Sequence, residues 1–231
     1  MNSFDQPVQP SQKGKDGRGK SLTVDVFFDF ICPWCWIGTR HLSSALSAFE
    51  KMHPEVKTKV RWRSYPLLPD TPEKGVPYQT FYLSRLGSAT AVSMGRAQVE
   101  RAGQAVGIHF DFSRISVLPN TQRAHGVIKE FRRVDPDVQL DVLIDRIFGA
   151  YFNEGADIGD QDVLQRLKAE HDAAKALAPP TNWSSVSRQT LRGVAVPGVP
   201  YFIFNSDVSI SGAHNAGALL HAMRHAVSKS Q

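Results

Sequence analysis

The sequence predicts an α/β protein in which a β-α-β unit and a β-β-α unit enclose a large helical insertion. Short apolar runs near both ends of the chain are typical of buried strands, and the long stretches between them repeat apolar residues every three or four positions. Both cysteines fall where the first strand pattern changes to a helical one. We expect residues 1–20 to form a disordered tail, residues 21–70 and 191–231 to form one α/β domain, and residues 71–190 to form the insertion.

The amino-terminal unit begins with a short run rich in Val and Phe, from Leu22 to Ile31, which predicts a buried parallel strand. Apolar residues at helical spacing follow, from Trp36 to Met52. The alternating segment from Val56 to Trp62 then predicts a second strand. The first strand therefore ends at a position where ligand and chemical sites of open α/β sheets usually lie.

The central segment is predicted to be all-helical over residues 78–190, after a connection rich in Pro and Gly from Tyr65 to Pro77. Asp160 can cap one of its helices, and Asn120 or Thr121 can cap another. The stretches with helical spacing are 78–86, 91–106, 121–133, 138–153 and 161–178.

The carboxyl-terminal segment returns to strand patterns. The apolar run from Gly198 to Phe204, the turn residues 205–207 and the alternating run from Val208 to Gly212 predict a β-hairpin. A closing amphipathic helix follows, with Leu219 and Met223 on its apolar side. The complete order is the thioredoxin arrangement with helices inserted between its halves.

The cysteines form the motif Cys32-Pro33-Trp34-Cys35. A helix N-terminus presents unpaired N–H groups and a partial positive charge, which stabilise the thiolate that attacks a disulfide. Pro33 suits the first helical position, and Cys35 follows one turn later, so its sulfur can reach back to Cys32. The motif therefore predicts dithiol–disulfide exchange, with Cys32 attacking and Cys35 resolving.

Two other roles for the motif have less support from the sequence. A four-coordinate zinc site needs two more Cys or His ligands, but the chain has no other Cys and its one closely spaced His pair is His221 and His225. A purely structural disulfide would close a loop too short to restrict the unfolded chain much. We expect no metal.

Charge and hydropathy limit the partners. The net charge is +5, and four basic residues against two acidic ones in the first 20 residues supply +2 of it, which leaves too weak a charge for nucleic-acid binding. No run of about 18 apolar residues predicts a membrane span. Residues 1–20 lack the apolar core of a signal peptide, so we expect a cytoplasmic protein.

Other residues are expected to contribute to the site. A cis peptide bond before Pro200 would place the free backbone groups of Val199 beside Cys32, where an extended substrate could pair with them. A trans proline at a strand start is the alternative, and the Cys-x-x-Cys motif favours cis. Trp34, which we expect to face outward, could pack against substrate together with Pro33. Either Asp25 or Asp29 is a candidate for a buried proton acceptor under Cys35.

His125 and Asn120 lie in one short string at the start of a predicted helix. The simpler expectation is that Asn120 caps the helix and that His125 packs or forms a hydrogen bond. The alternative is that both residues face Cys32 across the domain interface and contact substrate.

Four segments resemble the DsbA-like thioredoxin superfamily, and within it the FrnE-like subgroup. The resemblance implies a thioredoxin-like fold with a large all-helical insertion and activity as a protein disulfide oxidoreductase or isomerase. It identifies Cys32 and Cys35 as the redox pair and Pro200 as the cis-proline, and it implies no bound cofactor, with glutathione as a candidate co-substrate. The segments are DFICPWCWIG (29–38), NTQRAH (120–125), AYFNEGADIGD (150–160), and GVPYF (198–202) with SGA (211–213).

A related branch resembles kappa-class glutathione transferases and hydroxychromene carboxylate isomerases, which typically carry Ser in place of the first Cys and bind glutathione. Retention of both Cys32 and Cys35 favours redox exchange over such a transferase or isomerase. A binding or chaperone-like module with incidental cysteines is a third alternative. The expected partner is a thiol or disulfide substrate, either protein or small molecule, and the helical insertion offers a surface for a homodimer.

Overall fold

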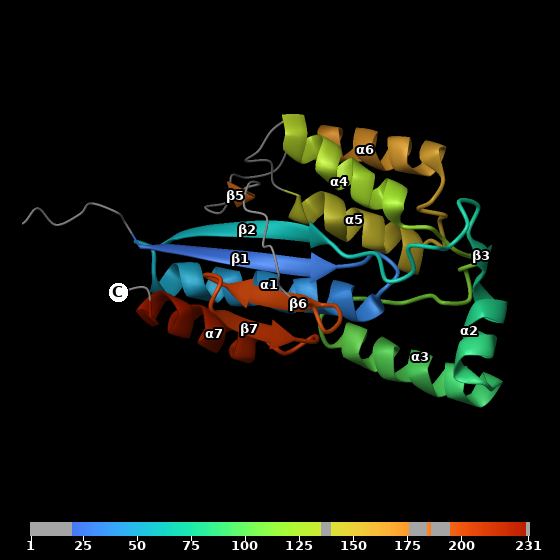
Figure 1. Cartoon of the computed structure of the whole chain (residues 1–231), viewed down its shortest axis with the longest axis horizontal. Coiled ribbons are helices and arrows are strands. Elements are labelled where there is room, and N and C mark those ends of the chain that lie inside the picture. Colours follow the sequence, from blue (N-terminus) through green and yellow to red (C-terminus); the bar gives the residue numbers. More distant parts are fainter. Residues whose placement is uncertain (1–19, 135–139, 176–183, 186–194, 230–231) are drawn as a thin grey trace, which may run out of the picture.

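A mixed sheet lies at the centre of the computed structural model, which describes residues 20–134, 140–175, 184–185 and 195–229 (Figure 1). Its strand order is β5-β2-β1-β6-β7. β1 (Ser21–Phe28) and β2 (Lys57–Ser64) are parallel, whereas β6 (Tyr201–Phe204) pairs antiparallel with both β1 and β7 (Val208–Ser211). The predicted β-α-β and β-β-α halves are confirmed, and together they form a thioredoxin-like fold.

Two helices complete these halves. α1 (Pro33–Met52) connects β1 to β2, and α7 (Ala216–Lys229) follows the β6-β7 hairpin. The two helices pack against each other, and α7 also packs against β1, β6 and β7. Leu22, Val24, Val26 and Phe28 alternate along β1 and are fully buried, as expected for the core face of a strand.

The first strand ends three residues earlier than its apolar run predicts. Asp29 and the two residues after it form a turn instead, because the chain must reverse to enter α1. The Cys32 N–H donates to the Asp29 carbonyl at 3.1 Å, and the Tyr65 N–H donates to the carbonyl of Phe28. The turn places both cysteines at the carboxyl end of β1.

The insertion contains all five predicted helices, with ends that shift by a few residues. α4, α5 and α6 form one group in Figure 1, and α2 and α3 extend away from it. Asp160 accepts hydrogen bonds from the N–H groups of Asp162 and Val163, so it caps α6 as predicted. The helices are α2 (Tyr78–Leu86), α3 (Ala89–Gln104), α4 (Gln122–Val134), α5 (Asp141–Phe152) and α6 (Gln161–Lys175).

The insertion is helical as predicted, and short strands that were not predicted also occur there. β3 (Val76–Pro77) pairs antiparallel with β4 (Val117–Leu118), and β5 (Ser184–Ser185) adds a parallel edge to β2. Strands of two residues are too short to show an alternating pattern. The predicted tail lies outside the described residues except for Lys20, as does most of the region between α6 and β6.

An aromatic cluster joins the two parts of the molecule. Trp36 of α1 is only 2% exposed, and its ring stacks on Phe148 and Phe152 of α5 with centroid distances of 6.0 and 6.1 Å. Phe28 lies 6.1 Å from Phe148. Trp36, Tyr151 and Phe152 are all core residues, each at most 2% exposed. Within the described part of the chain, no helix is both long and apolar enough to cross a membrane.

Candidate active site

The first cysteine stands at the N-cap of α1, as predicted. Cys32 has an extended backbone (φ −95°, ψ 108°), Pro33 is the first helical residue, and the Cys35 N–H donates to the Cys32 carbonyl at 3.0 Å. Both cysteines are free thiols. The sulfur of Cys32 therefore lies where the helix N-terminus favours a negative charge.

The proline loop meets this cysteine from the other half of the fold. The Val199–Pro200 peptide bond is cis, as predicted. The Cys32 Sγ–H donates to the Val199 carbonyl at 3.6 Å across 167 residues of sequence. The structure thus brings together Cys32, Val199 and Pro200, three of the residues selected from the sequence.

The two cysteines differ in exposure. Cys32 is 7% exposed and Cys35 is fully buried, while Pro33 and Trp34 beside them are partly exposed. Trp34 does not face fully outward, because it also packs against the buried core. Cys32 thus keeps a small exposed surface at this end of α1, and Cys35 has none.

The environment of Cys35 favours the neutral thiol. Burial raises its pKa well above the ordinary value, and the hydrogen bond and charge of Cys32 raise it further. A hydrogen bond from the Asp29 backbone lowers the pKa, whereas the charge of the Asp29 side chain raises it. Cys35 therefore holds its proton until a neighbouring group removes it.

Two buried carboxylates were candidates for that group, and their surroundings separate them. Asp25 is fully buried, but its oxygens lie 2.6 Å from Arg63 and 3.7 Å from Arg61 of β2, so its charge is compensated. Asp29 faces α4 instead: its Oδ1 lies 3.1 Å from His125 Nε2, and its Oδ2 accepts the Leu67 N–H at 2.7 Å. Asp29 is the carboxylate whose charge acts on Cys35.

The NTQRAH segment has two separate roles. Asn120 Oδ1 accepts the Gln122 N–H at 2.9 Å, so it caps the start of α4, and Asn120 Nδ2 donates to the Thr71 carbonyl at 2.6 Å. His125 is 2% exposed and packs against the rings of Phe28 and Phe30. Its ring is enclosed beside Asp29, so it does not meet substrate directly.

Two tyrosines of α2, Tyr78 and Tyr82, were not singled out by any sequence pattern. Burial raises the pKa of Tyr78 to about 12, and it also raises the pKa of Tyr82, to which the charge of Cys32 contributes. The two rings lie 4.7 Å apart on α2. In the sequence these residues showed only helical spacing, and the interaction of Tyr82 with Cys32 depends on how α2 docks.

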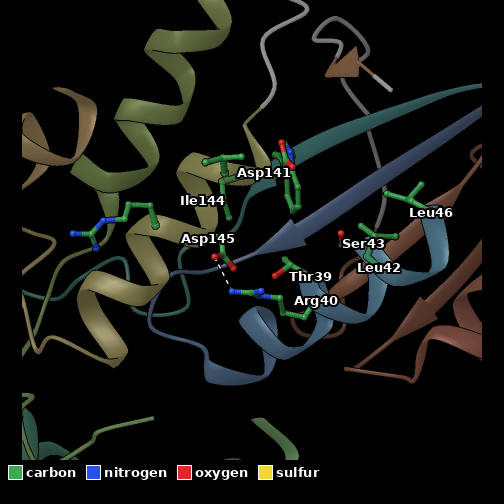
Figure 2. Close-up of a pocket in the computed structure, with 11 residues that line it drawn as sticks. Thr39, Arg40, Leu42, Ser43, Leu46, Asp141, Ile144 and Asp145 are labelled. Carbon is green, nitrogen blue, oxygen red and sulfur yellow. Dashed lines mark hydrogen bonds and ion pairs between the residues drawn. The ribbon is translucent and has the colours of Figure 1, made fainter. Parts of the chain in front are cut away.

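A separate pocket of about 360 Å³ lies between α1 and α5 (Figure 2). Its lining includes Thr39, Arg40, Asp141 and Asp145, and Figure 2 shows the ion pair between Arg40 and Asp145, whose atoms lie 2.8 Å apart. Neither cysteine nor Pro200 lines it. It is therefore distinct from the dithiol site.

The fold and the site define a thioredoxin-like protein with a dithiol at the start of its first helix. The chain belongs to the family of the DsbA-like thioredoxin domain, whose model matches residues 23–224. The match spans the sheet, the helical insertion and the cis-proline loop.

The individual proteins that resemble this chain have low sequence identity to it. YwbO of Bacillus subtilis, an uncharacterized protein, is 24% identical over 201 residues, which cover 84% of this chain and 91% of YwbO. The "probable DsbA oxidoreductase SCO1869" of Streptomyces coelicolor has a TM-score of 0.72 at 20% identity and covers 90% of this chain and 91% of its own. The structure of the cytosolic disulfide reductase DsbM of Pseudomonas aeruginosa with GSH has a TM-score of 0.50 at 15% identity, and covers 90% and 96%. These structural likenesses show the fold.

Proposed function

We propose that this chain is a thiol–disulfide oxidoreductase that works through Cys32 and Cys35. The observation that supports this most directly is the arrangement of two thiols at the N-terminus of α1, of which only Cys32 reaches the surface, beside the Val199 carbonyl. Membership in the DsbA-like family supports the same chemical class.

In the reducing direction, the Cys32 thiolate attacks a substrate disulfide and expels one substrate sulfur as a thiolate. Cys35 then attacks Cys32 in the mixed disulfide, which releases the second substrate sulfur and leaves the Cys32–Cys35 disulfide. Two electrons pass to the substrate. The oxidising direction is the reverse of these steps.

The loop opposite Cys32 supports a position for the substrate beside Val199. The backbone of Val199, whose carbonyl accepts from Cys32, can pair with an extended substrate segment, and the partly exposed Pro33 and Trp34 supply apolar contact. We include glutathione as a candidate co-substrate, because the DsbM structure with GSH shares this fold. We also propose a place in the FrnE-like subgroup, supported by the four matching segments, and a cytoplasmic location.

A redox titration in glutathione buffers tests the proposal, with Cys32→Ser and Cys35→Ser measured alongside the wild type. We expect the wild type to form one reversible disulfide with a defined two-electron potential. Cys35→Ser should accumulate a mixed disulfide on Cys32, and Cys32→Ser should form none, because Cys35 is buried. Glutathione binding without any reversible disulfide would instead support the transferase or isomerase alternative.

A further inference from the structure

A buried histidine and a buried carboxylate meet at the boundary between the two parts of the molecule. His125 of α4 is 2% exposed, Asp29 is fully buried, and His125 Nε2 lies 3.1 Å from Asp29 Oδ1. His125 Nδ1 is also buried and has no hydrogen-bond partner among the described residues. Burying two titratable groups is costly compared with apolar packing, so such a pair at a reactive site indicates a function.

Asp29 lies directly beside both cysteines. Its carbonyl accepts the Cys32 N–H at 3.1 Å, and its backbone forms a hydrogen bond with the Cys35 thiol. Its carboxylate contacts His125 of α4 and the N–H of Leu67, and its charge also acts on Cys35 of α1 and Tyr151 of α5. The charge of Asp29 raises the pKa of both Cys35 and Tyr151, so neither of these gives up its proton to water readily.

The resolving step needs a base at this place. Cys35 must become a thiolate before it can attack Cys32, and its sulfur is fully buried. A general base must lie close to the proton that it removes. Asp25, the other buried carboxylate of the same segment, is paired with Arg63 and Arg61.

We propose that Asp29 and His125 form the pair that accepts the Cys35 proton when the mixed disulfide on Cys32 is resolved. This inference rests on the proposed function. The Cys35 sulfur forms a bond with Cys32 Sγ, and the bond between Cys32 and the substrate sulfur breaks. The substrate leaves as a thiolate with the electron pair of that bond, and the Asp29–His125 pair holds the proton until the departing thiolate or solvent takes it.

The two members of the pair have complementary tasks. An isolated carboxylate would oppose the thiolate that it helps to form, because two negative charges would face each other in a buried site. A proton shared with His125 offsets that charge. Since His125 belongs to the helical insertion, the insertion supplies part of the chemistry of the thioredoxin-like half.

The reaction with dithiobis(nitrobenzoate), followed by stopped flow, tests the proposed function and the role of the Asp29–His125 pair separately. Attack by Cys32 releases a first equivalent of thionitrobenzoate, and resolution by Cys35 releases a second. The first release tests the proposed function, and the second tests the role of Asp29 and His125.

Asp29→Asn distinguishes proton transfer from a purely electrostatic role, because the two predict opposite signs. Removing the charge lowers the pKa of Cys35, so electrostatics alone would make the second release faster. Loss of a proton acceptor should make it slower, by about 100-fold, while the first release is unchanged. His125→Gln, which can still donate to Asp29 but cannot take up a proton, should also slow the second release and change its pH profile.

Asp25→Asn and His171→Gln are the matched controls, since both residues are buried and neither contacts the cysteines. They should leave both releases unchanged.

In the wild type, the second release should show a larger solvent deuterium isotope effect than the first, a measurement that does not depend on how the variants fold. No first release in the wild type would contradict the proposed function. A normal first release with an unchanged or faster second release in Asp29→Asn and His125→Gln would overturn the inference.

Discussion

Cys32 and Cys35 belong to one motif, yet the fold gives them different chemical properties. Cys32 lies at the helix N-cap beside the Val199 carbonyl, whereas Cys35 lies one turn further on, fully buried beside Asp29. Access therefore favours Cys32 as the attacking sulfur, and the raised pKa of Cys35 delays its ionisation until resolution. A difference between two positions one helical turn apart thus sets the order of the steps.

The buried thiol should make the stability of the reduced protein depend on pH. In the unfolded chain Cys35 titrates near its ordinary pKa of 9.0, and in the folded protein its pKa is higher. The folded state then holds a proton that the unfolded state has lost, so the stabilisation is present below pH 9.0 and is lost as pH rises. The free energy of unfolding should fall with a slope approaching about 1.4 kcal/mol per pH unit.

Urea unfolding of reduced protein between pH 9.0 and 10.0 measures this slope, since the ordinary tyrosine pKa lies at the upper limit of this range. Cys35→Ser, which has no thiol at this position, should show a smaller slope. Equal slopes in the two proteins would contradict the assignment to Cys35.

At the residue scale, a feature of the site could be predicted from the sequence when the residues that form it lie close together along the chain. Cys32 at the N-cap and Asp160 as a cap follow from patterns within a few residues, and the cis bond before Pro200 was predicted with the help of the Cys-x-x-Cys motif. The choice of Asp29 over Asp25 does not follow from such a pattern, because it depends on which side chains surround each carboxylate. His125 is 96 residues from Asp29, and only the docking of α4 brings them together.

At the scale of elements, α1 carries the site and also determines how closely the proline loop approaches. Its Gly38 faces Pro200 one turn after Cys35, and a Cβ at this position would lie 3.0 Å from Pro200 Cγ and 3.2 Å from Phe202 Cζ. The absence of a side chain lets the loop pack against the helix near Cys32. The helical pattern predicted α1 itself, but the sequence does not show which residue faces this contact.

Gly38→Ala should therefore destabilise the protein, although Ala is the better helix former. Overpacking a tight contact costs about 1–3 kcal/mol, which exceeds the roughly 0.5–1 kcal/mol that Ala contributes within a helix. Displacement of Pro200 should also slow the attack by Cys32. Denaturant unfolding and the rate of disulfide exchange measure these two effects.

Gly95→Ala on α3 is the matched control, because nothing lies within 4 Å of the Cβ position. It should stabilise the protein by about 0.5–1 kcal/mol and leave exchange unchanged. A Gly38→Ala protein as stable as the Gly95→Ala protein would show that the loop yields without cost.

At the scale of the whole molecule, the thioredoxin-like half and the helical insertion share one core. The sequence predicted both parts and their order along the chain, because each has its own periodicity. It did not predict which faces meet, since the stacking of Trp36 on Phe148 and Phe152 depends on the packing of α1 against α5. Asp145 of α5 fixes this junction: it accepts hydrogen bonds from Trp36 Nε1 at 2.7 Å and from Arg40 at 2.8 Å.

Because the core is shared, we expect the two parts to unfold in a single transition, with Asp145 stabilising both. Asp145→Ala leaves the buried Trp36 N–H without its acceptor, which costs about 1–3 kcal/mol. Asp145→Asn keeps an acceptor and loses only the partly exposed ion pair with Arg40, which is worth at most about 1 kcal/mol. Asp172→Ala, at an exposed position on α6, should have little effect.

Unfolding followed by tryptophan fluorescence and circular dichroism should give coincident curves in every variant, with the largest shift for Asp145→Ala. Separate transitions for the two probes would show that the insertion folds independently, and equal shifts for the Ala and Asn variants would assign the stabilisation to the ion pair rather than to the Trp36 hydrogen bond.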